Sequence, residues 1–119
     1  MSPHSDASLT ERFRRGDVYP HSFRSTTKQK VLDRFRNSDG DIVNPETGEV
    51  IPVDQVTIEH LQSVAEHWNN EGYNQTRKER ADWYNNVDNL SVLPRSVNSS
   101  RGALNGQTMR QDVGPKFRK

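Results

Sequence analysis

The chain has 119 residues, of which 29% are hydrophobic, and its formal net charge at pH 7 is +1. This length fits one domain with a thin core. The chain contains no cysteine, so disulfides and thiolate metal sites are excluded. It also contains no apolar run long enough to span a membrane and no signal-peptide core, so we expect it to act in an aqueous compartment.

The charges are unevenly distributed along the chain. Residues 10–36 and 95–119 are basic, whereas residues 39–71 are acidic. Basic ends around an acidic centre favour a nucleic-acid enzyme with a cation site over a uniformly basic binder. Taken alone, however, this charge clustering is better explained as an ordinary solvated surface.

The first two segments differ in regularity. Residues 1–25 show little periodicity and carry several Pro, Gly and Ser residues, so we expect a loosely structured N-terminal extension. Residues 26–36 predict a helix that Ser25 or Thr26 can cap, with its apolar side chains on one face.

The next two segments predict short β-structure. Residues 41–51 predict a β-hairpin, because Gly48 in the Asn-Pro-Glu-Thr-Gly turn can adopt a positive φ. A β-prone run, Val56-Thr57-Ile58, then predicts a short strand that directly precedes the pair Glu59-His60.

Two helices and a third strand are predicted after this pair. The first helix runs to about Asn70, and the second spans roughly 76–85 and opens on a Thr-x-x-Glu capping box. An apolar run at 90–93 then predicts a strand, and Pro94-Arg95-Ser96 predicts the start of another helix.

These elements define an α+β organisation with a core region at 26–103, preceded by the extension at 1–25 and followed by a polar, basic tail at 104–119. The predicted core residues are Val31, Leu32, Phe35, Ile42, Val50, Ile51, Ile58, Leu61, Val64, Ala65, Trp68, Trp83, Tyr84, Leu90, Val92 and Leu93.

The candidate site combines the pair Glu59-His60 with two asparagines nine positions apart, Asn89 before the third strand and Asn98 in the last helix. This is the layout of a ββα-metal nuclease site. His60 is the candidate general base that activates water. Glu59 and Asn98 offer hard oxygen ligands that suit Mg²⁺ or Mn²⁺. Asn89 is expected to fix the loop that carries His60.

Three further side chains are candidates for the same chemistry. Arg95 and Arg101 lie within one or two helical turns of Asn98 and are expected to hold phosphates. The second acid–histidine pair, Glu66-His67, makes His67 a weak metal-ligand candidate that would move the preference toward Zn²⁺ or Ni²⁺. A solvated helix face is the slightly favoured explanation of His67.

Each residue also has a simpler explanation when it is taken alone. A Glu-His pair is common at helix starts, and asparagines are common in turns and caps. Three hypotheses therefore stand beside one another: a metal-dependent endonuclease, a non-catalytic nucleic-acid-binding ββα module, and a protein-interaction domain.

At these residues the chain resembles the HNH/endonuclease VII superfamily. Residues 89–102, which end in Asn-x-x-Arg-Gly, resemble the second half of the HNH domain in CRISPR-guided nucleases. Residues 39–52 resemble the hairpin before the active histidine in polymorphic toxins, most of all the GH-E type, named for Gly, His and Glu. Tyr84-Asn85-Asn86 and the ending at 113–117 are also similar to those proteins. The resemblance covers roughly residues 26–117.

The resemblance implies a small ββα-metal core, also called an HNH or His-Me finger, with additional helices. It implies a divalent-metal DNase that forms the C-terminal toxin domain of an antibacterial effector. Such a domain acts in the cytoplasm of the target cell and is neutralised by a cognate immunity protein. Glu59 departs from the family, which usually has Gly or Asp before the histidine, and the family glutamate is matched by Glu66 only at a different spacing. The long separation of His60 from Asn89 implies inserted helices.

Overall fold

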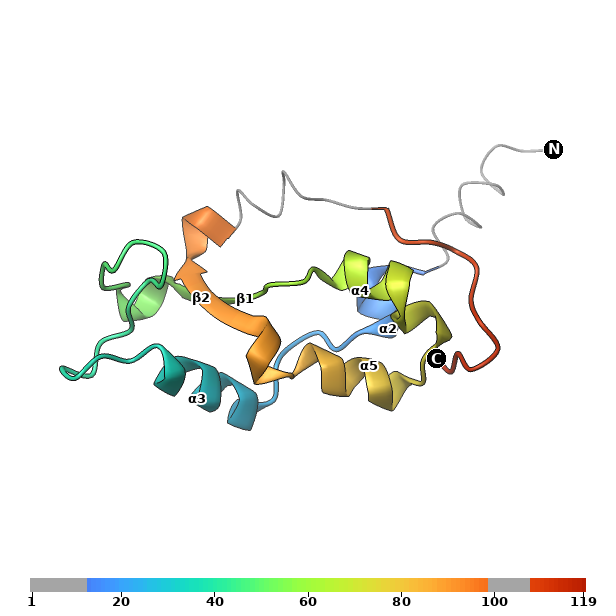
Figure 1. The fold of residues 1–119 in the computed structure, drawn as a ribbon, viewed down its shortest axis with the longest axis horizontal. Helices are drawn as coiled ribbons and strands as arrows, with labels where there is room; N and C mark the ends of the chain where they lie inside the picture. Colours follow the sequence, from blue (N-terminus) through green and yellow to red (C-terminus); the bar gives the residue numbers. More distant parts are fainter. Residues whose placement is uncertain (1–12, 99–107) are drawn as a thin grey trace. The chain divides into compact units, whose positions relative to one another are not determined.

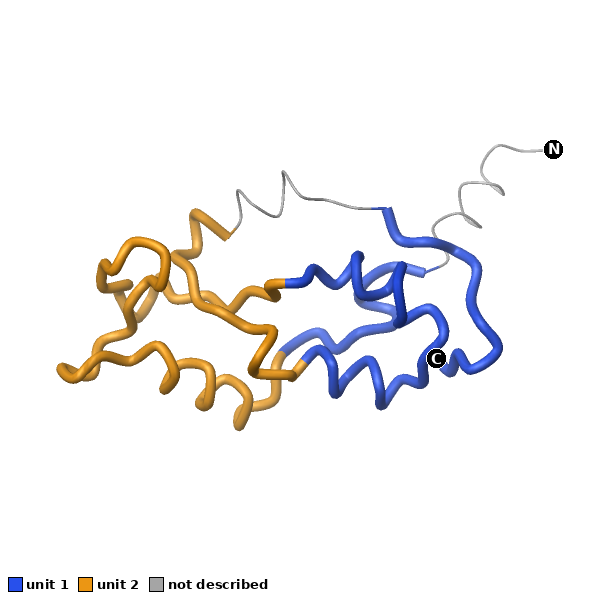
Figure 2. Tube along the Cα trace, viewed as in Figure 1, with its two compact units in different colours: residues 1–22, 62–84, 107–119 blue, residues 23–61, 85–106 orange. Residues whose placement is uncertain are grey.

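The computed structural model describes residues 13–98 and 108–119. The chain divides into two compact units (Figure 2). Unit 1 comprises residues 1–22, 62–84 and 107–119, and unit 2 comprises residues 23–61 and 85–106.

Unit 2 is built on two paired strands and one packed helix (Figure 1). Strand β1, Val56–His60, pairs antiparallel with β2, Leu90–Pro94, and Ile58 lies opposite Val92. Helix α3, Ser25–Arg34, contacts β2. The buried core of the unit consists of Val31, Ile42, Ile51, Leu90 and Val92. The helix and both strands therefore form where the sequence predicts them.

The start of α3 differs from the expectation in one detail. The N-cap residue is Arg24, whose side chain makes no capping hydrogen bond, and Ser25 is already the first helical residue. The prediction that Ser25 or Thr26 caps the helix is therefore wrong.

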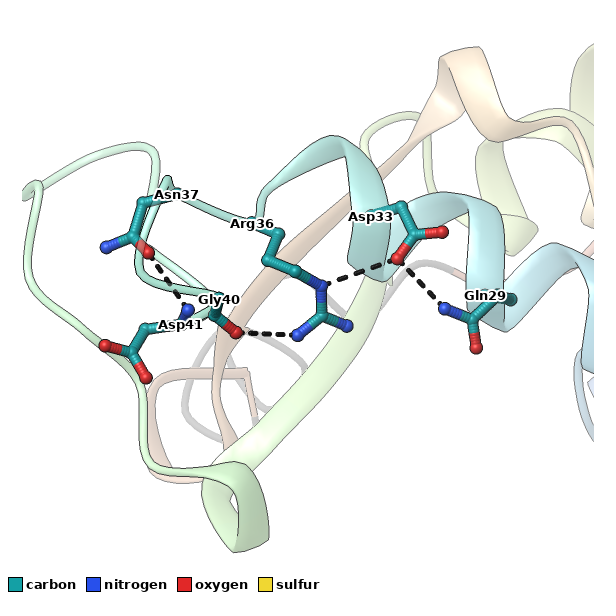
Figure 3. Close-up of polar contacts among 6 residues, drawn as sticks. All are labelled: Gln29, Asp33, Arg36, Asn37, Gly40 and Asp41. Atoms are coloured by element: carbon teal, nitrogen blue, oxygen red, sulfur yellow. Dashed lines mark hydrogen bonds and ion pairs between the residues drawn. The ribbon is translucent and has the colours of Figure 1, made fainter.

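A side-chain network fixes the turn that follows α3 (Figure 3). The Arg36 guanidinium donates to the Gly40 carbonyl at 2.7 Å and to Asp33 Oδ1 at 3.4 Å. Asn37 Oδ1 accepts from the main-chain nitrogen of Asp41 at 2.9 Å. Gly40 has φ +87°, a value that glycine adopts without the steric cost of a Cβ.

The predicted hairpin at 41–51 is present in unit 2. Val43 lies opposite Val50, and the nitrogen of Ile51 donates to the carbonyl of Ile42 at 2.8 Å. Gly48 has φ +78°, as its place in the turn predicts. Val50 is 52% exposed, so its assignment to the core is wrong. A short 3₁₀ turn, η1, Val53–Gln55, then leads into β1.

Unit 1 contains the inserted helices and both ends of the described chain. Ser63 caps the first of these helices, α4 (Val64–Asn70), by accepting from the nitrogen of Glu66 at 3.1 Å. The predicted capping box is confirmed, because Thr76 and Glu79 each accept the other's main-chain N–H. The elements are α2, Arg15–Val18; α4, Val64–Asn70; η2, Gly72–Asn74; and α5, Arg77–Tyr84.

The core of unit 1 is aromatic and uses residues from the N-terminal segment. Phe13, Val18 and Tyr19 are buried, so residues 13–22 are not the loose extension that their low periodicity suggests. They are ordered because their apolar side chains pack with those of α4 and α5, among them Trp68. In unit 2, Leu61 is 64% exposed and does not belong to the core.

One buried cation joins the separate segments of unit 1. Arg80 on α5 is fully buried, and its guanidinium donates to the carbonyls of Val18 at 2.6 Å, Gln75 at 2.6 Å and Arg118 at 2.8 Å. It also lies 4.9 Å from the centre of the Phe117 ring. Burial lowers the pKa of Arg80 from its ordinary value. Residues far apart in the sequence are thus fixed by a single side chain.

Candidate functional site

The two faces of the β1–β2 pair carry different side chains. Because side chains alternate along a strand, Ile58 and His60 project to one face and Thr57 and Glu59 project to the other. Ile58 packs against the core of unit 2, so the first face is the core face. The Thr57 and Glu59 face is called the second face below.

Asn98 lies on the second face. Residues 95–98 are helical and follow β2 directly (Figure 1). The side-chain nitrogen of Asn98 donates to Thr57 Oγ1 at 3.1 Å, and Thr57 Oγ1 donates to the Leu93 carbonyl at 2.9 Å. The amide oxygen of Asn98 is then the atom that this residue can offer to a cation. The structure therefore brings Glu59 and Asn98 to the same face.

His60 projects from the core face instead. It is the last residue of β1 and lies opposite Leu90. Its ring centre is 5.3 Å from that of Phe23, with 33° between the ring planes. The structure therefore does not place the imidazole on the face of Glu59 and Asn98, although His60 is the next residue in the chain after Glu59.

Asn89 lies beside the end of β1, in the short 3₁₀ turn η3, Val87–Asn89. Its main-chain carbonyl accepts from the nitrogen of Leu61 at 2.8 Å, one residue after His60. This main-chain bond joins the segment that carries His60 to the start of β2, and the side-chain role that the sequence assigned to Asn89 stays a prediction. Asp88 beside it is 82% exposed and pairs with Arg34 at 3.1 Å.

The two arginine candidates have different outcomes. Arg95 is exposed at the start of the last helix, and its Nη2 donates to the carbonyl of Asp54 at 3.2 Å. Because a guanidinium has five N–H donors, this bond leaves donors that can face a phosphate. Arg101 lies outside the described residues.

His67 is part of the core of unit 1. It is 1% exposed, and its ring stacks on Trp83 with 3.9 Å between ring centres. Its Nδ1 lies 2.7 Å from the Tyr19 hydroxyl, and its Nε2 lies 3.6 Å from a carboxylate oxygen of Glu71. The favoured explanation, a solvated helix face, is therefore wrong. His67 also shares no helix with His60, which belongs to β1.

The protonation of this cluster follows from its surroundings. Burial raises the pKa of the Tyr19 hydroxyl, so the phenol keeps its proton at neutral pH. The carboxylate of Glu71 faces Nε2 of His67 and favours the tautomer with the proton there, so Nδ1 accepts from Tyr19. With this ring held in the core, the reason for preferring Zn²⁺ or Ni²⁺ is lost.

The donor set on the second face fits a hard cation. It consists of the carboxylate of Glu59 and the amide oxygen of Asn98, and Mg²⁺ is commonly held by one or two protein oxygens together with water and substrate phosphate. Within residues 13–98 and 108–119, no three His, Cys, Asp or Glu side chains group together as metal ligands. The closed ligand set of a structural zinc site is thus not found among the residues described.

Two features of the site could not be predicted from the sequence. Phe23 falls in a segment of low periodicity, and no local pattern indicates that its ring contacts His60. Thr57 was recognisable only as a residue two positions before Glu59 on the same strand face. Its bond to Asn98 joins residues 41 positions apart, which no local pattern predicts.

A two-stranded antiparallel sheet followed directly by a helix is compatible with an HNH-type fold. Residues 39–103, more than half of the chain, match the GH-E family, described as HNH/ENDO VII superfamily nucleases with conserved GHE residues. The chain therefore belongs to this nuclease family. Neither the curated proteins nor the solved structures give a significant match.

The matched segment contains both paired strands and all the candidate residues that the structure describes in unit 2, namely Glu59, His60, Asn89, Arg95 and Asn98. It also contains residues 62–84, the insertion that the long separation of His60 from Asn89 implies. In the part of the chain that the structure covers, no helix is long and apolar enough to cross a membrane.

Proposed function

We propose that this chain is a metal-dependent endonuclease that hydrolyses phosphodiester bonds of DNA. The observation that carries the proposal is the position of Glu59 and Asn98 on one face of the β1–β2 pair, within the segment that matches a nuclease family. An acid and an amide oxygen on a shared face provide the donors that a hard cation needs beside a phosphate.

In this proposal Glu59 and Asn98 hold the cation, with Mg²⁺ or Mn²⁺ as the preferred ions. When bound, the ion neutralises phosphate charge and stabilises the leaving oxygen. His60 accepts the proton of the attacking water, for which a neutral imidazole near pH 7 is suited. Arg95, exposed at the start of the helix, contacts a neighbouring phosphate.

His60 must turn toward the substrate to act as the base. Its place at the last residue of β1 allows this, because strand pairing ends there and the ring is only half-buried. The bond from Leu61 to the carbonyl of Asn89 holds the backbone on the far side of His60 during such a movement. The ring must leave Phe23 for this, and the backbone at the end of β1 must also turn, because side-chain rotation alone leaves the Cβ of His60 on the core face.

The biological role in the proposal is that of a toxin. It rests on the resemblance of the 39–52 hairpin and of the 113–117 ending to polymorphic toxins. We infer that the chain is the C-terminal domain of an antibacterial effector and acts in the cytoplasm of the target cell. A cognate immunity protein would neutralise it in the producing cell.

Plasmid cleavage tests the proposal. Purified protein is incubated with supercoiled plasmid in Mg²⁺, in Mn²⁺, and in EDTA, with the His60→Ala variant in parallel. The proposal expects nicking in either metal, none in EDTA, and none by the variant. Cleavage that persists in EDTA would overturn the metal dependence, and wild-type cleavage by the variant would overturn the role of His60.

A non-catalytic nucleic-acid-binding module is the second candidate function. One observation favours it: the imidazole of His60 packs on Phe23, on the face opposite Glu59. Such a module would shift duplex DNA in EDTA, with an affinity that falls steeply with salt, and would not cut plasmid in any metal. A protein-interaction domain would neither cut nor shift DNA.

A further inference from the structure

The C-terminal residues 108–119, called the strap below, are fixed to unit 1 and do not form the plain tail that their composition suggests. The indole nitrogen of Trp68 donates to the carbonyl of Arg110 at 2.7 Å. The side chain of Asn69 bonds the strap twice, to the carbonyl of Thr108 at 2.9 Å and to the nitrogen of Arg110 at 2.8 Å. The guanidinium of Arg110 lies 3.8 Å from the centre of the Tyr73 ring.

The second half of the strap is also fixed by hydrogen bonds. The nitrogen of Gly114 donates to the carbonyl of Tyr73 at 2.9 Å, and a Cβ at this position would collide with the side chain of Asn74. Asn74 Oδ1 accepts from the nitrogen of Lys116 at 2.8 Å. The main chain at Lys116 is therefore held beside the start of α5 by one main-chain bond and one bond to the side chain of Asn74.

Because of these bonds, several exposed cationic side chains lie together at the start of α5. The Arg118 nitrogen donates to the Gln75 carbonyl at 3.1 Å, and Arg77 donates to the Lys119 carbonyl at 3.4 Å. Glu79 is the acid beside them; its pKa is lowered chiefly by its bonds to Thr76 and also by the charge of Lys116. The cluster, called the strap patch, consists of Arg77, Lys116, Arg118 and Lys119, all of them exposed.

We propose that the strap patch binds the phosphate backbone of the nucleic acid that the candidate site cleaves. The inference rests on the proposed function, and it adds a substrate-binding surface in unit 1 to the candidate site in unit 2. The main chain that carries these cations is fixed before the polyanion binds, so only the side chains need to be ordered on binding.

The composition of the surface favours nucleic acid over an acidic protein partner. Protein interfaces gain most of their affinity from a few buried aromatic or apolar anchors. Of the large hydrophobic side chains that are exposed in the described residues, Val113 alone belongs to unit 1. Phosphate contacts need Lys and Arg side chains but no such anchor.

The test uses the double variant Arg77→Gln, Lys116→Gln. Its control is Lys28→Gln, Lys30→Gln, which removes the same charge from exposed positions on α3 in unit 2. Binding to a duplex DNA oligonucleotide is measured in EDTA across a salt series, and polyglutamate is the competing acidic polymer. Thermal unfolding establishes that both variants keep the wild-type fold.

Two lost phosphate contacts should make the plot of the logarithm of the binding constant against log salt less steep, reducing the size of its negative slope by about 2. The affinity at 0.1 M salt should fall on the order of tenfold per contact. In plasmid cleavage, KM should rise while kcat stays within a factor of about 2, because the lost contacts bind ground and transition states equally. The control should leave slope, affinity and KM unchanged.

Three outcomes would overturn the inference. One is an unchanged slope in the strap-patch variant, another is an equal loss in the control, and the third is competition by polyglutamate as strong as that by DNA. If wild type binds and cuts DNA while the strap-patch variant behaves like wild type, the inference fails and the proposed function stands. If wild type neither binds nor cuts DNA, the proposed function itself fails.

Discussion

Replacing Arg80 by Met should unfold unit 1 at a much lower denaturant concentration than wild type. Met keeps much of the side-chain volume but donates no hydrogen bonds. The carbonyls of Val18 and Arg118 would lose the N–H donor that Arg80 supplies, and the Gln75 carbonyl would keep only its bond from the Arg118 nitrogen. Because these carbonyls come from three separate segments, a single substitution removes a bond from each.

The size of the loss in the free energy of unfolding depends on how well water can replace the missing hydrogen bonds. An acceptor left unsatisfied by loss of its partner costs about 1–3 kcal/mol when it is buried. The bond to Val18 is buried and carries the full cost, whereas the bonds to Gln75 and Arg118 are partly buried, so water can replace them in part. We therefore expect a loss of roughly 3–5 kcal/mol in the free energy of unfolding, against a total of about 5–15 kcal/mol for a typical domain.

Urea unfolding followed by tryptophan fluorescence measures this loss. Both tryptophans of the chain, Trp68 and Trp83, belong to unit 1, so the signal reports on that unit. Arg80→Lys should lie between wild type and Met, because one ammonium group cannot reach all three carbonyls. The control Lys78→Ala removes an exposed ion pair on the same helix and should cost only roughly 0.3–0.5 kcal/mol. A shift for Arg80→Met no larger than that of the control would refute the reasoning.

Three further predictions concern the site and the strap. His60→Ala should lower the rate of plasmid cleavage by on the order of 10²–10⁴ while its circular dichroism spectrum stays that of wild type; a wild-type rate would contradict this. Asn98→Ala should raise the Mg²⁺ or Mn²⁺ concentration needed for half-maximal cleavage more than it weakens DNA binding in EDTA, and an unchanged metal titration would remove Asn98 from the ligand set. Gly114→Ala should destabilise unit 1 by roughly 1–3 kcal/mol, because the new methyl group must displace Asn74, and wild-type unfolding would contradict that collision.

The sequence by itself predicted the elements whose signals are local. The β-prone run before Glu59, the glycine of the hairpin turn and the Thr-x-x-Glu capping box each act within a few residues, so their patterns survive in any tertiary context. The nuclease family that the chain belongs to was predicted from the resemblance of residues 39–52 and 89–102 to HNH/endonuclease VII proteins, together with the acid, the histidine and the two asparagines.

Only the tertiary structure decided where the charged and polar side chains of unit 1 lie. The sequence favoured a solvated helix face for His67 and gave no indication of where Arg80 lies. Both are buried, since their partners are carbonyls and rings from segments 5 to 62 positions away along the chain. Residues 13–22 and 108–119 lack periodicity for the same reason, because their order comes mainly from these distant contacts, and the one regular element among them is the four-residue helix α2.

The faces of the candidate site were likewise set by tertiary structure. Sequence alternation places Glu59 and His60 on opposite sides of β1, but it does not say which side meets the core. Packing of Ile58 on the buried cluster fixed His60 on the core side, beside Phe23. The bond from Asn98 to Thr57 then fixed the helix over the other face. Which face a strand buries depends on the apolar surface available to cover it, and that surface exists only once the chain has folded.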